Sequence, residues 1–336
     1  MGILGDVIQM NVGQILQTPT VPAVDFTGKT VVITGANTGL GLEAAKHIYS
    51  LNASHLILAC RDLTKGEHAR TQIIEARRQS ASDQTQTVEV WQLDMANFGS
   101  VITFGERLKS LEKLHALIAN AGIDVDHWEL FEGMESTLTV NVVSTMLLAV
   151  LAIPQLQKTV AAEKESQPSH LTFTGSVIHI FAKDQYLSQP KTGNIFQSLN
   201  NPATADMSGR YLLSKLILLL CVRGLAHRLD RTNLTVNYVN PGWCKTELFR
   251  THDGGFGGRL GLRLIGRTAE EGSRTLVHGI SAGSESHGKY VSECRIKPES
   301  SFVRSESSAD IQERVWAELV TILETIRPGA TKDLIQ

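Results

Sequence analysis

Short apolar runs alternate with helical patterns along most of this chain. Six runs rich in Val, Ile and Leu are typical of buried strands, and a helical pattern follows each of the first five: KTVVIT, HLILAC, TVEVWQLD, LHALIANAG, SHLTFTGS and LTVNYVNPG. Parallel strands need crossovers of this length, and right-handed crossovers place helices on both faces of one sheet. The sequence therefore predicts an α/β fold: a single-domain, Rossmann-type, doubly wound parallel sheet with helices on both faces.

The alternation continues to about residue 292 without a linker, so residues 28–292 are expected to form one domain. Before it, residues 1–27 form an N-terminal extension. Within this extension, residues 3–16 predict a short helix that packs on the body or covers a pocket. After the domain, residues 293–336 form a C-terminal segment with a helix over residues 308–326.

Two long stretches interrupt the alternation. Residues 179–209 contain Pro190, Pro202 and several Asn, and residues 242–267 include GGFGGRLGLRLIG. Both are longer than the usual connection in a compact domain, and long loops commonly carry function. We therefore expect both stretches to be loops that shape or cover a substrate site.

Composition excludes several kinds of partner. The chain has 336 residues and a formal net charge of −2, so bulk charge offers no attraction to nucleic acid or to an anionic membrane. Its four cysteines have no metal-ligand spacing and form no disulfide framework, which predicts no metal site and a reducing, cytoplasmic location. No stretch is expected to be long enough for a membrane span, and peripheral membrane contact through residues 3–16 is the alternative.

Glycines mark the turn between the first strand and the helix after it. In TVVITGANTGLGLEAA, Gly35, Gly39 and Gly41 stand where the backbone must approach a bound phosphate closely. The helix that follows presents free N–H groups and the positive end of its dipole to that anion. A tight turn would also explain the glycines, but the strand before them and the helix after them favour a dinucleotide site.

The end of the second strand bears on which dinucleotide is bound. An acidic residue at this position hydrogen-bonds the adenosine ribose and selects NAD. The sequence here is LACRDL, in which Arg61 can pair with a 2′-phosphate. Asp62 can cap the next helix or face the ribose. The pattern favours NADP, with NAD as the alternative.

A tyrosine and a lysine four residues apart share one face of the helix in SGRYLLSKLILLLCV. Free tyrosine has a pKa of ~10, and a nearby cation favours the phenolate. Lys215 is therefore expected to lower the pKa of Tyr211. Ser176 ends the fifth strand, where its hydroxyl can hydrogen-bond a substrate oxygen as charge develops. Packing explains a lone Tyr or Lys, but the three together favour carbonyl reduction with Tyr211 as general acid and base.

Together these motifs resemble the classical short-chain dehydrogenases/reductases over about residues 28–292. The matching segments are TGANTGLG, LD (93–94), NAG (120–122), VN (140–141), Ser176, the Tyr211/Lys215 pair and NPGWCKT. Three further segments resemble those of the retinol dehydrogenase and protochlorophyllide reductase branch of the family: CRD, LDMANFGSV and RTAEEGSRTLVHGISAGSESHGKYVSE. It is also similar to reductases of fungal secondary-metabolite pathways.

The resemblance implies cofactor contacts at the turn after each strand. Besides Tyr211 and Lys215, it marks Gly35, Asn37, Thr38, Gly39, Leu40, Gly41, Arg61, Asp62, Asp94, Met95, Asn120, Ala121, Gly122, Pro241, Gly242, Cys244 and Thr246. Among these, Asp94 and Met95 would flank the adenine. By the same resemblance, Tyr211 and Lys215 contact the nicotinamide ribose, and a fourth catalytic residue, Asn141, orders a water that links Lys215 to solvent.

The interval between Ser176 and Tyr211 is longer than in the small reductases of this family, and residues 179–209 fill it. We expect this loop to lie over the active-site mouth, where a lid of this size suits a larger, mostly apolar substrate. Four side chains are candidates to line the substrate pocket or else to attach the loop to the body: Phe181, Tyr186, Ile195 and Phe196. His179 is interpreted as a structural or pocket-wall residue.

The predicted function is an NADP(H)-dependent oxidoreductase that interconverts a carbonyl and a secondary alcohol on a lipophilic small molecule in secondary-metabolite biosynthesis. The alternatives are a non-redox cyclase or nucleotide-sensing protein on the same fold, and a membrane-bound retinoid-type enzyme. The resemblance also suggests a homodimer or homotetramer in which helices over residues 135–160 and 208–229 pack against a twin. Burial within one subunit would produce the same apolar pattern.

Overall fold

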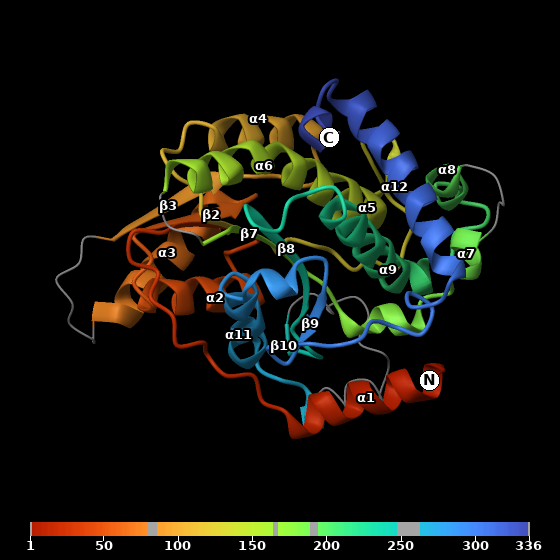
Figure 1. Cartoon of the computed structure of the whole chain (residues 1–336), viewed down its shortest axis with the longest axis horizontal. Helices are drawn as coiled ribbons and strands as arrows, with labels where there is room; N and C mark the ends of the chain where they lie inside the picture. Colours follow the sequence, from red (N-terminus) through yellow and green to blue (C-terminus); the bar gives the residue numbers. More distant parts are fainter. Residues whose placement is uncertain (1, 79–85, 164–166, 189–193, 247–262, 335–336) are drawn as a thin grey trace.

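The computed structural model describes residues 2–78, 86–163, 167–188, 194–246 and 263–334. Its centre is one eight-stranded sheet in the order β10-β9-β8-β7-β4-β1-β2-β3 (Figure 1). These strands are β1 (Thr30–Thr34), β2 (His55–Cys60), β3 (Thr87–Gln92), β4 (Ala116–Ala119), β7 (Ser169–Thr174), β8 (Leu234–Asn240), β9 (Tyr290–Ser292) and β10 (Arg295–Ile296). All neighbouring pairs are parallel except β9 with β10. The predicted doubly wound parallel sheet is confirmed.

Helices cover both faces of the sheet, and each face has its own apolar core. One layer contains α2 (Gly39–Ser50), α3 (Leu63–Arg78) and α11 (Ala269–Gly279); the other contains α4 (Phe98–Leu108), α6 (Thr145–Ala162) and α9 (Met207–Ala226) (Figure 1). Successive residues of a strand point to opposite faces. In β1, Val32 therefore joins the core of α4, α6 and α9, while Val31 and Ile33 join the core of α2, α3 and α11.

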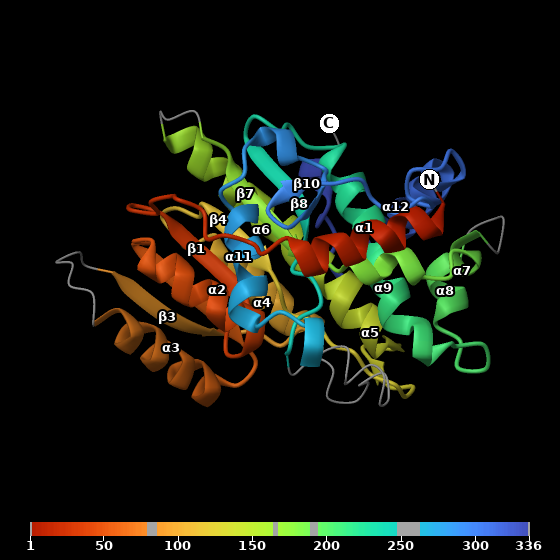
Figure 2. The ribbon, with the colours of Figure 1, turned by 90° about the horizontal axis from the view of Figure 1, so that it is seen from below.

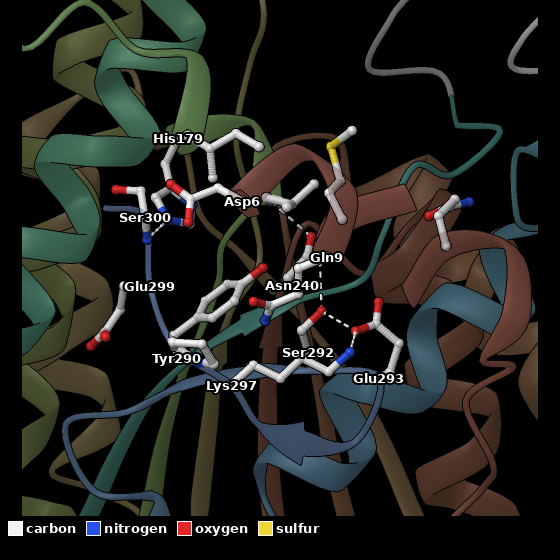
Figure 3. Close-up of a pocket in the computed structure, with 15 residues that line it drawn as sticks. Asp6, Gln9, His179, Asn240, Tyr290, Ser292, Glu293, Lys297, Glu299 and Ser300 are labelled. Atoms are coloured by element: carbon white, nitrogen blue, oxygen red, sulfur yellow. Dashed lines mark hydrogen bonds and ion pairs between the residues drawn. The ribbon is translucent and has the colours of Figure 1, made fainter. Parts of the chain in front are cut away.

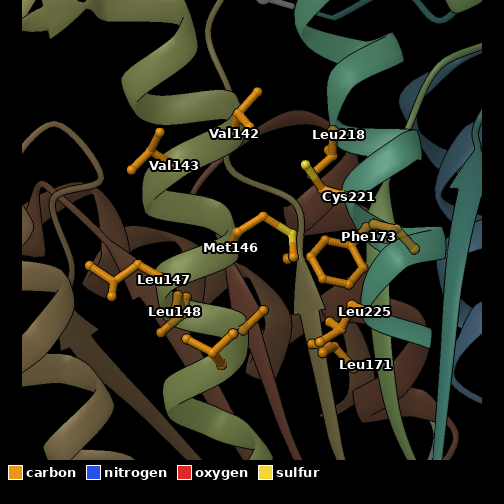
Figure 4. Close-up of a cluster of buried hydrophobic side chains, with 14 of the residues drawn as sticks. Val142, Val143, Met146, Leu147, Leu148, Leu171, Phe173, Leu218, Cys221 and Leu225 are labelled. Atoms are coloured by element: carbon orange, nitrogen blue, oxygen red, sulfur yellow. The ribbon is translucent and has the colours of Figure 1, made fainter. Parts of the chain in front are cut away.

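The helix that begins at Ser136 is the apolar centre of one layer. α5 (Ser136–Leu138), the π-helical turn η1 (Thr139–Ser144) and α6 continue one another. This stretch, Ser136–Ala162, is long and apolar enough to cross a membrane, so the expectation that no stretch reaches that length is wrong. The apolar window is entirely buried in the protein, where Met146, Phe173 and Leu218 belong to one cluster (Figure 4). It is therefore placed as a core helix.

The C-terminal helix α12 (Ser307–Ile326) packs along α9. Its Trp316 lies against Gly224, where an added Cβ would be 3.0 Å from the indole ring, and Arg223 Nε donates to Gln312 Oε1 at 3.0 Å. The apolar residues of α6 and α9 are thus buried within the chain, which is the second of the two explanations offered by the sequence. The reason is that α12 covers the face of α9 that could otherwise have packed against a second copy of the chain. Self-association stays a prediction.

The described residues between β7 and α9 include three short helices. They are η2 (Val177–Phe181), α7 (Gln185–Ser188) and α8 (Ile195–Leu199). Glu318 of α12 accepts hydrogen bonds from the N–H groups of Ile195 and Phe196, at 2.8 and 3.0 Å, and so caps α8. This arrangement ties the segment to the C-terminal helix.

The remaining elements lie at the periphery. They are α1 (Ile3–Leu16), the hairpin of β5 (Leu130–Phe131) and β6 (Met134–Glu135), η4 (Ser284–Ser286) and η5 (Lys332–Leu334). α1 is the expected N-terminal helix, and it lies across the outside of the molecule beside the carboxyl ends of β8 and β9 (Figure 2).

Candidate active site

A cavity of about 500 Å³ opens at the carboxyl ends of the central strands, a volume typical of small-molecule sites. It is lined by Gly35, Asn37, Thr38, Gly39, Leu40, Arg61, Asn120, Ala121, Gly122, Ile123, Asp124, Val125, Thr174, Gly175, Ser176, Tyr211, Lys215, Pro241, Gly242, Cys244 and Thr246. The turns after β1, β2, β4, β7 and β8 all contribute. The structure therefore brings the glycine turn and the tyrosine–lysine pair into one cavity.

The glycine turn forms a closely packed cradle at the N-terminus of α2. Gly35 and Gly39 have φ values of 65° and 56°, in the left-handed region that favours glycine. A Cβ at Gly41 would overlap the carbonyl oxygen of Gly35, so only glycine fits there. The Thr34 hydroxyl accepts from the N–H groups of Asn120 and Ala121, both at 2.9 Å, and thereby joins the turn after β4 to the end of β1.

Arg61 and Asp62 have different surroundings. Arg61 belongs to the lining of the cavity, as do Asn37 and Thr38. The Asp62 carboxylate accepts a hydrogen bond from the N–H of Lys65 at 3.1 Å, which is the role of an N-cap for α3. Of the two positions that the sequence left open for the ribose, Arg61 is the one that faces the cavity.

Lys215 is held at the inner end of the cavity. Its ammonium donates to the carbonyl oxygen of Thr174 at 2.9 Å and lies 5.6 Å from the ring centroid of Tyr211. Burial lowers the pKa of Lys215 to about 8, against an opposing effect of Asp124. At pH 7 the Lys215 side chain is therefore charged in most molecules, and it becomes mostly neutral as the pH rises above about 8.

Burial raises the pKa of Tyr211 well above its ordinary value, and the negative charge of Asp124 adds to the rise. The expectation that Lys215 lowers this pKa is therefore wrong for the protein alone. Tyr211 is only 6% exposed. The free energy lost by removing a phenolate from water exceeds the favourable interaction of that phenolate with the Lys215 ammonium. The phenol keeps its proton at neutral pH, which is the state required of a general acid.

Ser176 is fixed by a residue that sequence reasoning missed. Tyr238, buried in β8, accepts from the Ser176 N–H and donates to the Lys215 carbonyl oxygen, both at 3.0 Å. The Tyr238 ring occupies the space that a side chain at position 175 would need, so Gly175 is required beside it. The Ser176 hydroxyl accepts from the Ile178 N–H at 3.3 Å, and its own proton can be donated toward the cavity.

Asn141 lies on the π-helical turn η1, outside the cavity lining but next to residues that belong to it. Its side chain accepts from the N–H of Ile123 and donates to the carbonyl oxygen of Ile123, both at 2.8 Å, and it donates to the Ser214 hydroxyl at 3.1 Å. A Cβ at Gly122 would lie 3.1 Å from Asn141 Oδ1 and 3.9 Å from Lys215 Nζ. Asn141 therefore joins the turn after β4 to α9.

Several predicted positions do not reach the cavity. Those outside its lining are Gly41, Asp62, Asp94, Met95 and Asn141. The Asp94 carboxylate accepts from the Ala96 N–H at 3.0 Å. Conversely, Ile123, Asp124, Val125, Thr174 and Gly175 line the cavity although the sequence did not mark them. Their only signal was adjacency to the NAG and Ser176 motifs.

No described residue of 179–209 belongs to the lining of this cavity. Phe181 and Tyr186 line a separate cavity of about 920 Å³ on the outer side of α9, while Ile195 and Phe196 are buried in the core. Phe181, Tyr186, Ile195 and Phe196 are absent from the lining of the active-site cavity, and a lid over its mouth stays a prediction. Of the other predicted loop, residues 247–262 lie outside the described residues.

His179 is a structural residue. Its Nδ1 bonds the carbonyl oxygen of Ser176 at 2.7 Å, and its Nε2 accepts from the Ser300 N–H at 3.3 Å. Burial lowers its pKa and keeps the ring neutral. As for metals, no cluster of three or more His, Cys, Asp or Glu side chains that could hold an ion occurs within the described ranges.

Comparison with known proteins decides the family. The family model described as short chain dehydrogenase matches residues 29–177. A short chain dehydrogenase/reductase of Cryptosporiopsis sp. is 41% identical over 329 residues, which cover 95% of this chain and 98% of that protein. The chain belongs to the short-chain dehydrogenase/reductase family. A short-chain dehydrogenase of Penicillium roqueforti is 39% identical over 326 residues, covering 94% of this chain and 83% of that protein.

Solved structures agree on the fold of this short-chain dehydrogenase/reductase. A short chain dehydrogenase from Burkholderia cenocepacia, determined in complex with NADP, superposes with a TM-score of 0.58 at 20% identity. The match covers 80% of this chain and 96% of the other. At this identity the likeness concerns the fold alone.

The bridge made by Tyr238 leads to a first prediction. Tyr238→Phe keeps the ring but leaves the Ser176 N–H without its partner, whereas the Lys215 carbonyl oxygen keeps its helical hydrogen bond within α9. The free energy of unfolding should therefore fall by about 1 to 2 kcal/mol. Turnover should fall several-fold because Ser176 and Lys215 lose their fixed spacing. Urea unfolding and steady-state kinetics measure the two effects. Tyr49→Phe is the control, since Tyr49 is another buried tyrosine and lies on α2 outside the cavity lining; an equal loss of turnover in both variants would contradict the positioning role.

Proposed function

We propose that this short-chain dehydrogenase/reductase is an NADP(H)-dependent oxidoreductase that interconverts a carbonyl and a secondary alcohol on a lipophilic small molecule. The observation that carries the proposal is the shared cavity, which is lined at once by the glycine turn and by Ser176, Tyr211 and Lys215. A glycine cradle without the catalytic set would suit a nucleotide sensor equally well. The presence of the glycine turn and the catalytic set in the same cavity favours redox chemistry.

The cavity residues fit a dinucleotide phosphate. At Gly41 the turn leaves no room for a side chain, and the N–H groups at the start of α2 can hold a pyrophosphate. Arg61 would meet a 2′-phosphate, and with Asp62 engaged as a helix cap this supports NADP over NAD. Pro241, Gly242, Cys244 and Thr246 would hold the nicotinamide end.

When bound, NADPH supplies the hydride that adds to the substrate carbonyl carbon. Tyr211 gives its phenolic proton to the carbonyl oxygen, so one hydride and one proton convert C=O to CH–OH. Ser176 donates a hydrogen bond to the same oxygen as negative charge develops. The Lys215 ammonium stabilises the phenolate that remains, and a proton from solvent restores the phenol. In the reverse direction Tyr211 takes the proton as the base.

Asn141 has a supporting role in this scheme. It holds the Ile123 backbone and the Ser214 hydroxyl in place on the far side of Lys215. By family resemblance it also orders a water between Lys215 and solvent, which would be the route by which the phenol is reprotonated.

The substrate class follows from the cavity walls and from the relatives. Leu40, Ile123 and Val125 add apolar surface around the polar catalytic groups, which suits a lipophilic carbonyl. Relatives in Cryptosporiopsis and Penicillium, two fungal genera, support a role in secondary-metabolite biosynthesis. The reducing cytoplasm, where NADPH is abundant, is the proposed location.

The acid is tested by Tyr211→Phe. The variant should lose at least about 100-fold in kcat, because general acid–base catalysis contributes factors of this order and more. Its Kd for NADP should stay within about three-fold of wild type, since the ring remains. NADPH oxidation with a panel of lipophilic ketones, alongside calorimetric NADP binding, measures both. Product formation without NADPH consumption in the wild type would favour the non-redox cyclase instead.

The lysine predicts a pH dependence. Lys215 is charged below its pKa of about 8 and neutral above it, so kcat/KM for carbonyl reduction should fall as pH rises through that value. We use kcat/KM because it reports ionisations of the free enzyme. Lys215→Arg keeps its charge to above pH 12. Its residual activity should therefore be flat between about pH 7 and 9, and a parallel fall in both proteins would assign the ionisation elsewhere.

Cofactor choice is tested at Arg61. Arg61→Ala should raise KM for NADPH by about 10- to 100-fold through loss of charge-assisted hydrogen bonds to the 2′-phosphate. KM for NADH should change little. Lys65→Ala, a change of charge on the neighbouring α3 outside the cavity lining, is the control. An equal rise in KM for NADPH and for NADH in Arg61→Ala would show that Arg61 does not bind the 2′-phosphate.

A further inference from the structure

The N-terminal helix α1 docks on the body through its polar side. Its exposed side chains include Leu4, Ile8 and Leu16, while Asp6 is buried. Asp6 accepts from the Ser301 N–H at 2.7 Å and pairs with Arg304 at 3.2 Å, which anchors the first half of the helix. The aliphatic residues therefore contribute little to docking, and specific hydrogen bonds decide where α1 lies.

Gln14 anchors the second half of α1 at two distant places in the chain. Its Oε1 accepts from the Trp243 N–H at 2.9 Å, and its Nε2 donates to the carbonyl oxygens of Trp243 and Ile265 at 3.1 and 2.8 Å. Trp243 lies just beyond the end of β8, and Ile265 lies just before α11. One side chain thus satisfies three backbone groups and holds these two points together.

Arg267 completes the same junction from the body side. It is 6% exposed, and its guanidinium donates to the carbonyl oxygens of Gly13, Gln17 and Pro241 at 2.8, 2.7 and 3.2 Å. It also pairs with the buried carboxylate of Glu293 at 3.3 Å. A buried arginine needs such a full set of acceptors, so the carbonyl groups at the end of α1 are part of what stabilises its charge.

The junction lies directly behind the cavity wall. Gly242 has a φ of 84°, and a Cβ there would overlap Arg267 Nη1 and lie 2.7 Å from Gln14 Oε1. The two side chains therefore pack on the backbone of a turn whose other side lines the cofactor cavity. Only a residue without a Cβ allows that contact.

A chain of hydrogen bonds continues from the junction through Glu293, Ser292 and Asn240, which are labelled in Figure 3, to the N–H of Val177, the residue after Ser176. Glu293 accepts from the Ser292 hydroxyl at 2.6 Å, and Asn240 Nδ2 donates to that hydroxyl at 3.0 Å. Asn240 Oδ1 then accepts from the N–H groups of Val177 and Gly242, at 2.9 and 3.1 Å. The backbone beside Ser176 and the turn at Gly242 are thus set by one polar network that ends on α1.

We propose that α1 is a built-in part of the cofactor site and that Gln14 is a positioning residue for the Pro241–Thr246 turn. Gln14 itself lies outside the lining of the cofactor cavity. It holds the turn in the conformation that receives the nicotinamide end of the dinucleotide. This inference rests on the proposed function only in requiring that the cavity binds NADP(H), and it does not depend on which carbonyl is reduced.

The test compares two matched variants of the full-length protein, Gln14→Ala and Asp6→Ala. Each removes the anchoring side chain from one half of α1, but only Gln14 contacts the turn beside the cavity. Gln14→Ala should weaken NADP binding, measured by calorimetry, about ten-fold, and raise KM for NADPH in proportion with kcat nearly unchanged. Asp6→Ala should lower the Tm comparably and leave both constants unchanged.

A second variant separates hydrogen bonding from general loosening of α1. Gln14→Glu keeps the size of the side chain but cannot donate to the carbonyl oxygens of Trp243 and Ile265, so it should weaken NADP binding as much as Gln14→Ala. Wild-type affinity in both Gln14 variants, or an equal loss in Asp6→Ala, would overturn the proposal. Because NADP binding is read without turnover, a wild-type protein that binds NADP but reduces no carbonyl would refute the proposed function and leave this inference standing.

Discussion

The parallel pairing of β1, β4, β7 and β8 is the constraint on which the site depends. Parallel strands in one sheet end at the same edge, so the turns that follow them converge although they are far apart in sequence. Gly35 follows β1, Asn120 follows β4, Ser176 follows β7 and Pro241 follows β8. The Thr34 hydroxyl and the Tyr238 hydroxyl then join neighbouring turns by hydrogen bonds, which converts an edge of the sheet into a cavity of defined shape.

Burial, more than charge pairing, controls the two titrating groups of the site. Tyr211 and Lys215 both lie away from water, and each is shifted toward its neutral form. A phenol that keeps its proton and an ammonium that releases its own near pH 8 are suited to proton delivery in carbonyl reduction. Helical spacing placed the two groups together, but spacing contains no information about solvent.

The elements predicted from sequence were those with a local signal. Alternating strands and helices, the glycine turn and the Tyr211/Lys215 pair each occupy a short window, and their periodicity and turn chemistry are readable within it. The behaviour of residues 179–209 was not readable in this way. Ile195 and Phe196 could have lined a pocket or a core, and what decided was α12, whose Glu318 caps α8 from more than one hundred residues away.

Sequence by itself determined the fold class, the family and most of the residues that meet at the cavity, because these follow from local patterns and from chemistry that only a few residue types can perform. Tertiary structure alone decided the protonation of Tyr211, the role of Tyr238 and the attachment of α1 through Gln14 and Arg267. Each of these depends on burial or on hydrogen bonds between segments remote in the chain. Desolvation and long-range contacts exist only once the chain has folded.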